Sequence, residues 1–551
     1  MNRKVFAWGA IYGALAGIIV VALTYLGERL FSLSFLPFDI FDWLARILPG
    51  PLVSFLIDLI VRLTGQLNLG PTASAAKQIE QGIAIIELIL AGTIFGLVLA
   101  GLGRRKPHSL ILYGFYGGVI LWLAAILIEL SVGFPGVETG TLPMIFSSLW
   151  LGLVLIGGGA LLGRLLHDTY MQTEGKPEET AGAVLSRRQF LYLIGAGSAA
   201  VVVSAIGLAL FPQEEKAAAG VATTETGSGL PEIGAFDTSG PAASPPRNAL
   251  DARIQPTPGT RPELTSNQDF YRVDINTIPP QVNGNTWQLK LDGQVENPLT
   301  LSLDEIKARP STSQVITLEC ISNQVGGDLI STALYTGVTL KSLLDEAKMK
   351  PNAQALSVKA VDGFYETVSM QDMMDERTLL VYEMNQQPLP VEHGYPLRLY
   401  IPNHFGMKQP KWITHMQVID NQGSGYWEDR GWSEQAIPET TSVIDAIDTD
   451  QVSSNSNSVP IGGIAYAGAR GISKVEIKID DGAWEETELR DPPLSSLTWV
   501  QWRYNWLASP GKHLVSVRAY DGAGKLQQST ETPPYPDGAT GINTKNAVVL
   551  S

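Results

Sequence analysis

Residues 313–320, Ser-Gln-Val-Ile-Thr-Leu-Glu-Cys, run directly into Ile-Ser-Asn-Gln-Val-Gly-Gly at 321–327. The first stretch is rich in apolar and β-branched residues, which predicts a strand. The second ends in two glycines, which predicts a loop. Together they place Cys320 at the end of a strand, on the rim of a sheet. A thiolate there can bind a soft or high-valent metal, and the alternative is a small buried hydrophobic side chain.

Cys320 is the only cysteine in the chain of 551 residues. A disulfide within the chain is therefore excluded. A thiolate zinc cluster, an iron–sulfur cluster and a C-x-x-C-H haem attachment are excluded too, because each needs several cysteines. The formal net charge of -15 argues against nucleic acid as a partner, since binding phosphates needs a basic face.

Long apolar runs dominate the sequence up to Phe211, and the whole chain is 45% hydrophobic and only 17% charged. Four runs reach the roughly 20 residues that span a bilayer, and a fifth follows; they lie at about 5–27, 83–103, 109–132, 145–166 and 190–211. Basic residues cluster at the ends of these runs. The positive-inside rule then places the N-terminus in the cytoplasm and everything after Phe211 outside. We predict an α-helical transmembrane bundle over residues 1–211 of a multi-pass protein of the cell membrane.

The apolar stretch from Phe35 to Leu63 does not fit this series of spans. Pro51 interrupts it, and several charged residues are spread through it. A single extra span here would invert every later loop. We therefore expect interfacial or re-entrant helices, or a hairpin, in this stretch.

The fifth run opens on Ser186-Arg187-Arg188-Gln189-Phe190-Leu191. A pair of arginines can simply anchor a helix at the cytoplasmic surface. Within Ser-Arg-Arg-x-Phe-Leu, ahead of a run rich in Gly and Ala, the pair resembles a twin-arginine export signal. That route carries folded proteins, so the prediction is export of the following domains as a folded unit.

Three segments follow the membrane part. Residues 212–261 are rich in Ala, Gly, Ser, Thr and Pro without periodicity, which predicts a flexible linker. Residues 262–430 mix short β-rich runs with helical stretches such as Leu340 to Ala347, which predicts an α+β domain. Residues 431–551 alternate polar and apolar residues between turn signals, a pattern typical of a β-sandwich.

Several short motifs follow one another in a fixed order along residues 262–551. They are Thr317-Leu318-Glu319-Cys320-Ile321-Ser322-Asn323, Tyr335-Thr336-Gly337-Val338, Tyr382-Glu383-Met384-Asn385, His393-Gly394-Tyr395-Pro396-Leu397-Arg398 and Gly406-Met407-Lys408 with Lys411-Trp412. In this order they resemble the sulfite oxidase family of molybdopterin enzymes. Residues 468–484 resemble the immunoglobulin-like dimerisation domain of that family. The resemblance implies a molybdopterin-binding catalytic domain at 262–430 and a dimerisation domain at 431–551, which would allow a homodimer.

The resemblance also implies a cofactor, one molybdenum held by the dithiolene of a molybdopterin, with Cys320 as the metal's protein ligand. It assigns contacts with the pterin or its phosphate to His393 and Arg398 and to the turn of Gly406, Met407 and Lys408. A phosphate needs a guanidinium fork, a point positive charge and free backbone N–H groups, which these residue types provide. If the motif is disregarded, Arg398 and Lys408 are expected to be solvated side chains at strand ends, and His393 is expected to be a histidine in a turn. The other predicted cofactor-binding residues are Tyr271, Arg272, Asn323, Asp362 and Lys411.

The predicted catalytic residues are Cys320, Arg272, Arg470 and Tyr365. Arg272 belongs to Phe270-Tyr271-Arg272, which matches a family motif whose arginine faces the substrate anion. Arg470 matches a position whose family counterpart also reaches the substrate pocket. Two arginines would bind an oxyanion such as sulfite.

The sequence departs from the sulfite-oxidising pattern at two places. In Asp362-Gly363-Phe364-Tyr365, the aromatic that aligns more naturally with the family's active-site tyrosine is Phe364. Asn323-Gln324-Val325 lacks the arginines that sulfite oxidases carry after this asparagine. The reaction therefore stays open between sulfite oxidation and reduction of an S- or N-oxide.

None of the six histidines lies within a predicted span, since His108 and His167 are at span edges and the others follow Phe211. Bis-histidine haem within the bilayer is therefore not expected. The membrane part is predicted to be an anchor, and electrons would pass to or from a separate carrier, a cytochrome or a quinone-linked protein. The excess of acidic residues follows residue 212, which would favour a basic carrier.

Two other classes of function remain as alternatives. A non-catalytic, membrane-tethered binding module would have little physical reason to retain Cys320 together with the phosphate ligands. A transporter would need charges along its pathway, and the spans hold few, with Glu87 and Glu129 near helix ends.

Overall fold

The computed structural model describes residues 3–66, 72–133, 141–173, 254–449 and 458–550, and these form two compact units. The first, here called the helical unit, comprises Met1–Leu48, Lys77–Ala222 and Asp274–Asn283 as far as they are described. The second, the β-rich unit, comprises Pro49–Ala76, Thr223–Val273 and Gly284–Ser551 on the same terms. Residues 274–283 thus belong to the helical unit, although the residues on both sides of them belong to the β-rich unit. Residues 49–76 belong to the β-rich unit, although the residues on both sides of them belong to the helical unit.

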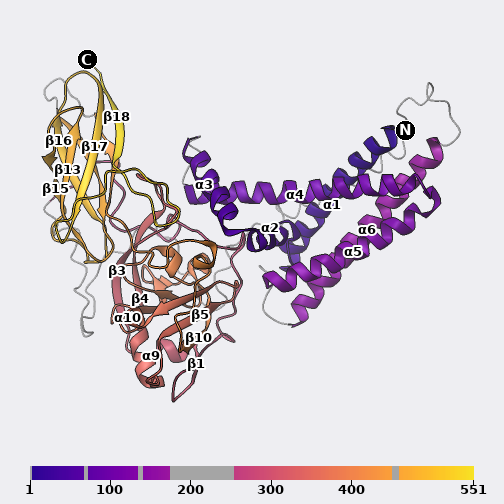
Figure 1. Cartoon of the computed structure of the whole chain (residues 1–551), viewed down its shortest axis with the longest axis horizontal. Coiled ribbons are helices and arrows are strands. Elements are labelled where there is room, and N and C mark those ends of the chain that lie inside the picture. Colours follow the sequence, from indigo (N-terminus) through magenta and orange to yellow (C-terminus); the bar gives the residue numbers. More distant parts are fainter. Residues whose placement is uncertain (1–2, 67–71, 134–140, 174–253, 450–457, 551) are drawn as a thin grey trace. The chain divides into compact units, whose positions relative to one another are not determined.

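The helical unit is built on long apolar helices (Figure 1). They are α1 (Arg3–Phe31), α4 (Thr72–Gly103), α5 (Leu110–Val132) and α6 (Thr141–Thr173). Each contains a stretch long and apolar enough to cross a bilayer: Val5–Phe31, Ser74–Gly103, Pro107–Val132 and Leu142–Met171. The expected membrane-length helices are thus confirmed for the first four runs. The fifth run and its arginine pair lie outside the described residues.

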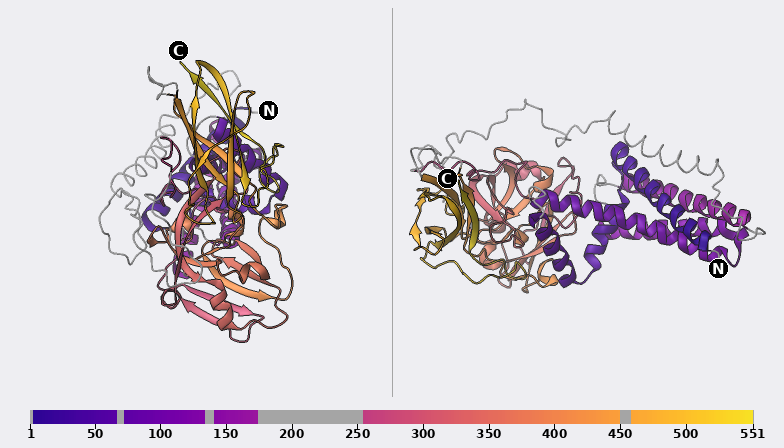
Figure 2. Two further views of the ribbon diagram at one scale, coloured as in Figure 1. Left: turned by 90° about the vertical axis from the view of Figure 1, so that its left-hand side faces the viewer. Right: turned by 90° about the horizontal axis from the view of Figure 1, so that it is seen from above.

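Glycines let these helices approach closely (Figure 2). A Cβ placed on Gly13 of α1 would lie 2.3 Å from the carbonyl oxygen of Gly92 in α4. One placed on Gly114 of α5 would lie 2.2 Å from the carbonyl oxygen of Gly159 in α6. Both distances are far inside van der Waals contact, so only glycine fits. Small residues at the crossing are how apolar helices pack where the surroundings offer no hydrophobic driving force.

The stretch between α1 and α4 forms two shorter helices, α2 (Leu36–Ile47) and α3 (Gly50–Gln66). Pro37 lies in the first turn of α2, where a missing N–H costs nothing. The charged face of α2 turns inward, because Asp39 and Asp42 are only 2% and 1% exposed. Neither helix is among the four of membrane length.

Two five-stranded sheets form the α+β part of the β-rich unit. The first has the order β2 (Leu299–Ser302), β1 (Gln288–Gly293), β10 (Ile413–Ile419), β5 (Ala355–Ala360), β6 (Tyr365–Ser369), and β1 and β10 run parallel. The second has the order β3 (Thr312–Glu319), β4 (Ile330–Thr339), β7 (Leu379–Met384), β8 (Gln387–Pro388), with β9 (Arg398–Tyr400) also paired to β7. Short helices α8 (Leu303–Lys307), α9 (Leu340–Ala347) and α10 (Met370–Met373) follow strand ends. The predicted mixture of strands with a helix at 340–347 is confirmed.

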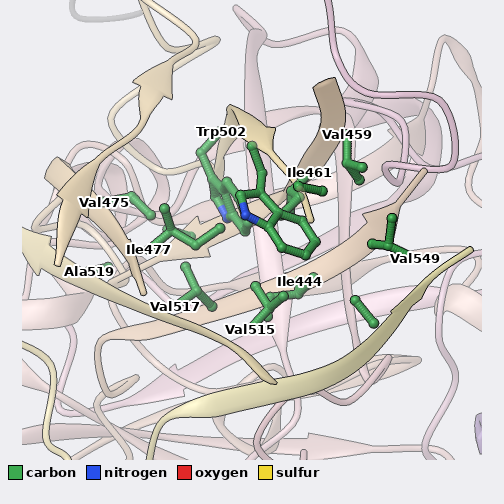
Figure 3. Packing of buried hydrophobic residues seen from close by; sticks show 14 residues of the cluster. Ile444, Val459, Ile461, Val475, Ile477, Trp502, Val515, Val517, Ala519 and Val549 are labelled. Atoms are coloured by element: carbon green, nitrogen blue, oxygen red, sulfur yellow. The ribbon is translucent and has the colours of Figure 1, made fainter. Parts of the chain in front are cut away.

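Two four-stranded antiparallel sheets form the C-terminal part. One has the order β11 (Thr441–Ile447), β12 (Ser458–Tyr466), β16 (Val500–Leu507), β15 (Glu488–Leu489), and the other β14 (Glu485–Glu486), β13 (Ile472–Ile479), β17 (Gly511–Asp521), β18 (Asn543–Val549). Their inner faces share one core around Trp502 (Figure 3). The indole N–H of Trp502 donates to the carbonyl of Ile464 at 3.2 Å, so this fully buried side chain leaves no polar group unsatisfied. The predicted β-sandwich is confirmed.

Trp502→Ala should therefore lower the free energy of unfolding of the β-rich unit by about 3–5 kcal/mol, through lost burial and the cavity left behind. Denaturant titration of the full-length protein in detergent would measure it. Leu507→Ala on the same strand is the matched control: its side chain is 81% exposed, and we expect a change within about 0.5 kcal/mol. Equal effects of the two substitutions would contradict this account of the core.

Candidate active site

Cys320 follows the last residue of β3, as the sequence predicts. Its backbone N–H donates to the carbonyl of Leu329 at 2.9 Å, which extends the β3–β4 pairing by one more bond. The side chain is 7% exposed, and its sulfur lies 3.0 Å from the hydroxyl of Ser322. The thiol is thus buried at a strand end, with one hydroxyl beside it.

The loop after Cys320 is organised by Asn323. Its backbone N–H donates to the carbonyl of Cys320 at 3.0 Å, its side-chain amide donates to Glu319 at 2.9 Å, and its side-chain oxygen accepts from the N–H of Leu329 at 3.0 Å. Gly327 packs so tightly on this side chain that a Cβ would lie 2.4 Å from its oxygen. Asn323, predicted to bind cofactor, here shapes the loop that follows the thiol.

The other edge of β3 is covered by the C-terminal sandwich. Thr317 receives a hydrogen bond from Tyr466 at its carbonyl (3.0 Å) and donates its own N–H to the carbonyl of Leu497 (3.0 Å). The N–H of Trp499 donates to its hydroxyl at 2.9 Å. The strand that ends at Cys320 is therefore bonded along both edges.

Burial sets the electrostatics around the thiol. It raises the pKa of Cys320, while the hydroxyl of Ser322 and the ammonium of Lys411 oppose the rise. Burial also raises the pKa of Glu319 to about 7, against the hydrogen bond from Asn323. Among the described residues no group of three or more His, Cys, Asp or Glu side chains could hold a metal by itself.

Tyr271 lies close to Cys320. Burial raises the pKa of Tyr271 well above its usual value, and Cys320 is the next contributor, which places the two side chains within electrostatic range. The N–H of Tyr271 donates to the hydroxyl of Ser331 at 3.1 Å. A Cβ on Gly406 would lie 2.6 Å from the Tyr271 hydroxyl, so this turn accepts only glycine. Phe270 stacks on Tyr271 and meets His393 edge-on, at ring separations of 5.5 and 5.4 Å.

Arg398, His393 and Lys411 converge at Gly394. The backbone there has φ +113°, and a Cβ would lie 3.1 Å from the Cβ atoms of both Arg398 and Lys411. Arg398 donates to the carbonyl of His393 at 3.2 Å and lies over the ring of Tyr335, 5.6 Å from its centre. Lys411 donates to the carbonyls of Val273 and Glu392, each at 3.3 Å. Both side chains are basic and lie at this turn, which suits an anionic ligand.

Lys408 has a different environment. It is 5% exposed and forms ion pairs with Glu366, at 2.9 Å, and with Glu428. Its neighbour Met407 packs among Ile321, Phe405 and Trp432. The ammonium of Lys408 is therefore paired with carboxylates of the protein. If the turn of residues 406–408 binds a cofactor, its backbone groups are better placed to do so than this ammonium.

The structure gives partners within the protein for three of the remaining predicted residues, Arg470, Tyr365 and Asp362. Arg470 pairs with Asp521 at 3.3 Å and donates to the carbonyl of Pro438 at 2.8 Å. The hydroxyl of Tyr365 donates to Asp429. The carboxylate of Asp362 accepts from the N–H of Phe364 at 3.0 Å and closes the turn between β5 and β6. Arg272 follows Tyr271 and is partly buried.

Three residues at the site were not among the predicted ones: Glu319, Ser322 and Tyr335. Glu319 could have been noticed, because a carboxylate within the apolar run of β3 must find a partner when buried. Ser322 and Tyr335 belong to two of the motifs of the resemblance. Their spacing in the sequence does not indicate that Ser322 contacts the thiol or that Tyr335 lies beneath Arg398. The catalytic and cofactor-binding roles of the other residues stay predictions.

Lys408→Met should lower the free energy of unfolding by about 3–5 kcal/mol, because two buried carboxylates would lose their common partner. Denaturant titration in detergent would measure it. Lys290→Met serves as the control, since Lys290 is 60% exposed in its pair with Asp292 and should contribute less than about 1 kcal/mol. A small effect of the first substitution would show that the buried pair is not formed.

Comparison with known proteins agrees with this geometry. Residues 276–427 match the family described as oxidoreductase molybdopterin binding domain. The uncharacterized oxidoreductase YuiH of Bacillus subtilis is 27% identical over 177 residues, 32% of this chain and 87% of that protein. Mitochondrial sulfite oxidase of Rattus norvegicus is 26% identical over 325 residues, 50% of this chain and 59% of that protein. A putative protein-methionine-sulfoxide reductase subunit, YedZ1 of Azospira oryzae, is 28% identical over 153 residues, 28% of this chain and 56% of that protein.

The residues around Cys320 fit a phosphorylated pterin that carries a metal. The strand end presents a thiol, Arg398 and Lys411 are basic side chains that meet at Gly394, and Gly406 lies against Tyr271 with no room for a side chain unless Tyr271 moves. The matched regions cover less than two thirds of the rat and Azospira proteins, so the activities in their names are not transferred here. The chain therefore carries a molybdopterin-binding domain of the sulfite oxidase family, followed by immunoglobulin-like sheets and preceded by apolar helices of membrane length.

Proposed function

We propose that this protein is a membrane-anchored molybdenum oxidoreductase that transfers an oxygen atom, with sulfite as its substrate. The observation that carries the proposal is the convergence of a buried thiol, Cys320, with two basic side chains, Arg398 and Lys411, near the turn of Gly394. Molybdopterin, when bound, supplies two-electron redox chemistry coupled to oxygen-atom transfer. The protein supplies the binding site and its charges.

In this proposal Cys320 is the metal's protein ligand. Binding to a metal deprotonates a thiol outright, which overcomes the rise in pKa that burial causes. Ser322, 3.0 Å away, can donate to the resulting thiolate. Arg398, Lys411 and the backbone at Gly394 and Gly406 would hold the phosphate and the pterin.

Arg272 and Arg470 are proposed to bind the substrate oxyanion. Arg470 would then share its charge between the substrate and Asp521. Oxidation of one sulfite takes one oxygen atom from water, yields sulfate, releases two protons and passes two electrons to the carrier. Tyr365, which donates to Asp429, would lie at the margin of this site.

A second candidate function is reduction of an S- or N-oxide on the same scaffold. It is favoured by the loop after Asn323, which continues as Gln324-Val325 without arginines. One relative also bears the name of a putative protein-methionine-sulfoxide reductase subunit. A neutral substrate would need fewer cationic side chains near the metal than sulfite does.

We further propose that the β-rich unit works on the extracytoplasmic side, after export through the arginine pair at 187–188. A separate cytochrome or quinone-linked protein would exchange electrons with it, and the immunoglobulin-like domain would form a homodimer. The four membrane-length helices support membrane anchoring, and the basic residues at their ends support this orientation.

Cys320→Ser should abolish turnover, because a hydroxyl is a poor replacement for a thiolate on molybdenum. The measurement is molybdenum and pterin content together with turnover of sulfite and of a panel of sulfoxides and N-oxides. Protein from cells grown on tungstate is the control for metal dependence. Unchanged turnover in the variant would refute the assignment of Cys320, and turnover of oxides without sulfite would select the second function.

Gly406→Ala should reduce the molybdopterin content of the purified protein by roughly ten-fold, because the added methyl group must displace Tyr271. Pterin analysis by fluorescence after oxidation measures this without any turnover. Gly157→Ala is the control, since a Cβ at Gly157 would meet nothing within 4 Å. Full cofactor content in Gly406→Ala would contradict the placement of the pterin beside this turn.

A further inference from the structure

The segment Asp274–Asn283 follows the Phe270-Tyr271-Arg272 motif after one residue, Val273, but is part of the helical unit. Within it, Asn276 and Thr277 are only 1% and 2% exposed. Two consecutive polar residues that are so deeply buried need specific partners, because leaving a buried polar group without a hydrogen bond is unfavourable.

Asp42 of α2 supplies the partners of Thr277. The backbone N–H of Thr277 donates to both carboxylate oxygens of Asp42, at 2.9 and 3.0 Å, and the Thr277 hydroxyl donates to one of them at 2.7 Å. Asp42 itself is 1% exposed. The buried carboxylate of Asp42 thus accepts three hydrogen bonds from a single residue of the segment, Thr277.

Two cations of the helical unit bind the neighbouring residue. Arg46 of α2 donates to the side-chain oxygen of Asn276 at 2.6 Å, and Lys77 of α4 donates to the backbone carbonyl of Asn276 at 2.9 Å. Arg46 also donates to the carbonyls of Ser131 and Val132, at 3.0 and 3.4 Å, where α5 ends and its last carbonyls lack helical partners.

The three charged residues compensate one another. Burial raises the pKa of Asp42 to about 6, and the hydrogen bonds from Thr277 and the charges of Lys77 and Arg46 oppose that rise. Lys77 also pairs with Glu80 at 2.9 Å. Without the segment, the carboxylate of Asp42 would lose both donors of Thr277 and the three hydrogen bonds that they make.

The other end of the motif is fixed within the β-rich unit. The N–H of Tyr271 donates to Ser331, and the ammonium of Lys411 donates to the carbonyl of Val273 at 3.3 Å. Only Val273, Asp274 and Ile275 separate Arg272 from Asn276. Arg272 is therefore close along the chain to residues held in each of the two sets of contacts.

We propose that Asp42, Arg46 and Lys77 are positioning residues that clamp residues 276–277 and thereby fix the backbone leaving the Tyr271-Arg272 motif. The role of that motif at the cofactor rests on the proposed function, whereas the clamp itself does not. The helical unit then has a second task besides anchoring, because it holds the chain next to a predicted substrate-binding arginine.

Hydrogen exchange of the full-length protein in detergent, followed by mass spectrometry, tests the clamp. Asp42→Ala should raise the exchange rate at 274–279 by at least about ten-fold, since it removes the acceptor of three hydrogen bonds to a charged group. Exchange at 270–273 should rise with it. Asp42→Asn retains an acceptor oxygen for Thr277 and should restore most of the protection.

Asp345→Ala is the matched control, because Asp345 is 54% exposed in its pair with Lys341 and should alter neither segment. Thr277→Val removes only the hydroxyl donor, so the expected increase in exchange rate at 274–279 is smaller. This variant replaces Asp42→Ala in the test if Asp42→Ala does not fold. Fast exchange of 274–279 in the wild-type protein would overturn the clamp. Faster exchange at 274–279 with no change at 270–273 would overturn the positioning role.

Exchange requires neither cofactor nor turnover, so this outcome is separable from that of the proposed function. A protein without molybdenum that still shows the protected segment would support the clamp while refuting the enzyme. Loss of molybdopterin content in Asp42→Ala, with restoration in Asp42→Asn, would show that the clamp supports the cofactor binding of the proposed function.

Discussion

The hydrogen bonds at Thr317 are the constraint on which the rest of the site depends. A strand at the edge of a sheet exposes unpaired N–H and C=O groups, and β3 would be such a strand if the chain ended after the α+β part. The immunoglobulin-like sheets cover it through Tyr466, Leu497 and Trp499. Cys320 follows directly on the last residue of β3, three residues after Thr317, so its position depends on both domains. The C-terminal sheets therefore belong to the site's architecture as well as to any dimer.

The basic side chains of the site lie in two places. Lys408 pairs with two buried carboxylates and stabilises the fold. Arg398 and Lys411 lie together at the turn of Gly394, where each donates to a backbone carbonyl. The residue types alone do not distinguish the two places, since all three residues occur in motifs of the same resemblance.

The sequence was sufficient for features that depend on local pattern. The strand before Cys320 and the helix at 340–347 follow from periodicity and turn residues, and the structure confirms both. The partners of Lys408 could not be predicted, because Glu366 precedes it by 42 residues and Glu428 follows it by 20, and only the tertiary fold brings them together. The same holds for Asp42 and Thr277, 235 residues apart. Long-range polar contacts carry no periodic signal.

Tyr466 links the two ends of the proposed substrate site. Burial raises its pKa, the carboxyl of Glu319 raises it further and the guanidinium of Arg470 lowers it, so both groups lie within electrostatic range of one phenol. Glu319 adjoins Cys320 in the chain. Arg470, although paired with Asp521, is thus one side chain removed from the neighbourhood of the thiol. If the proposed function holds, Arg470 would be the positive charge that the immunoglobulin-like domain brings to the substrate anion, in addition to the cover that this domain gives to β3.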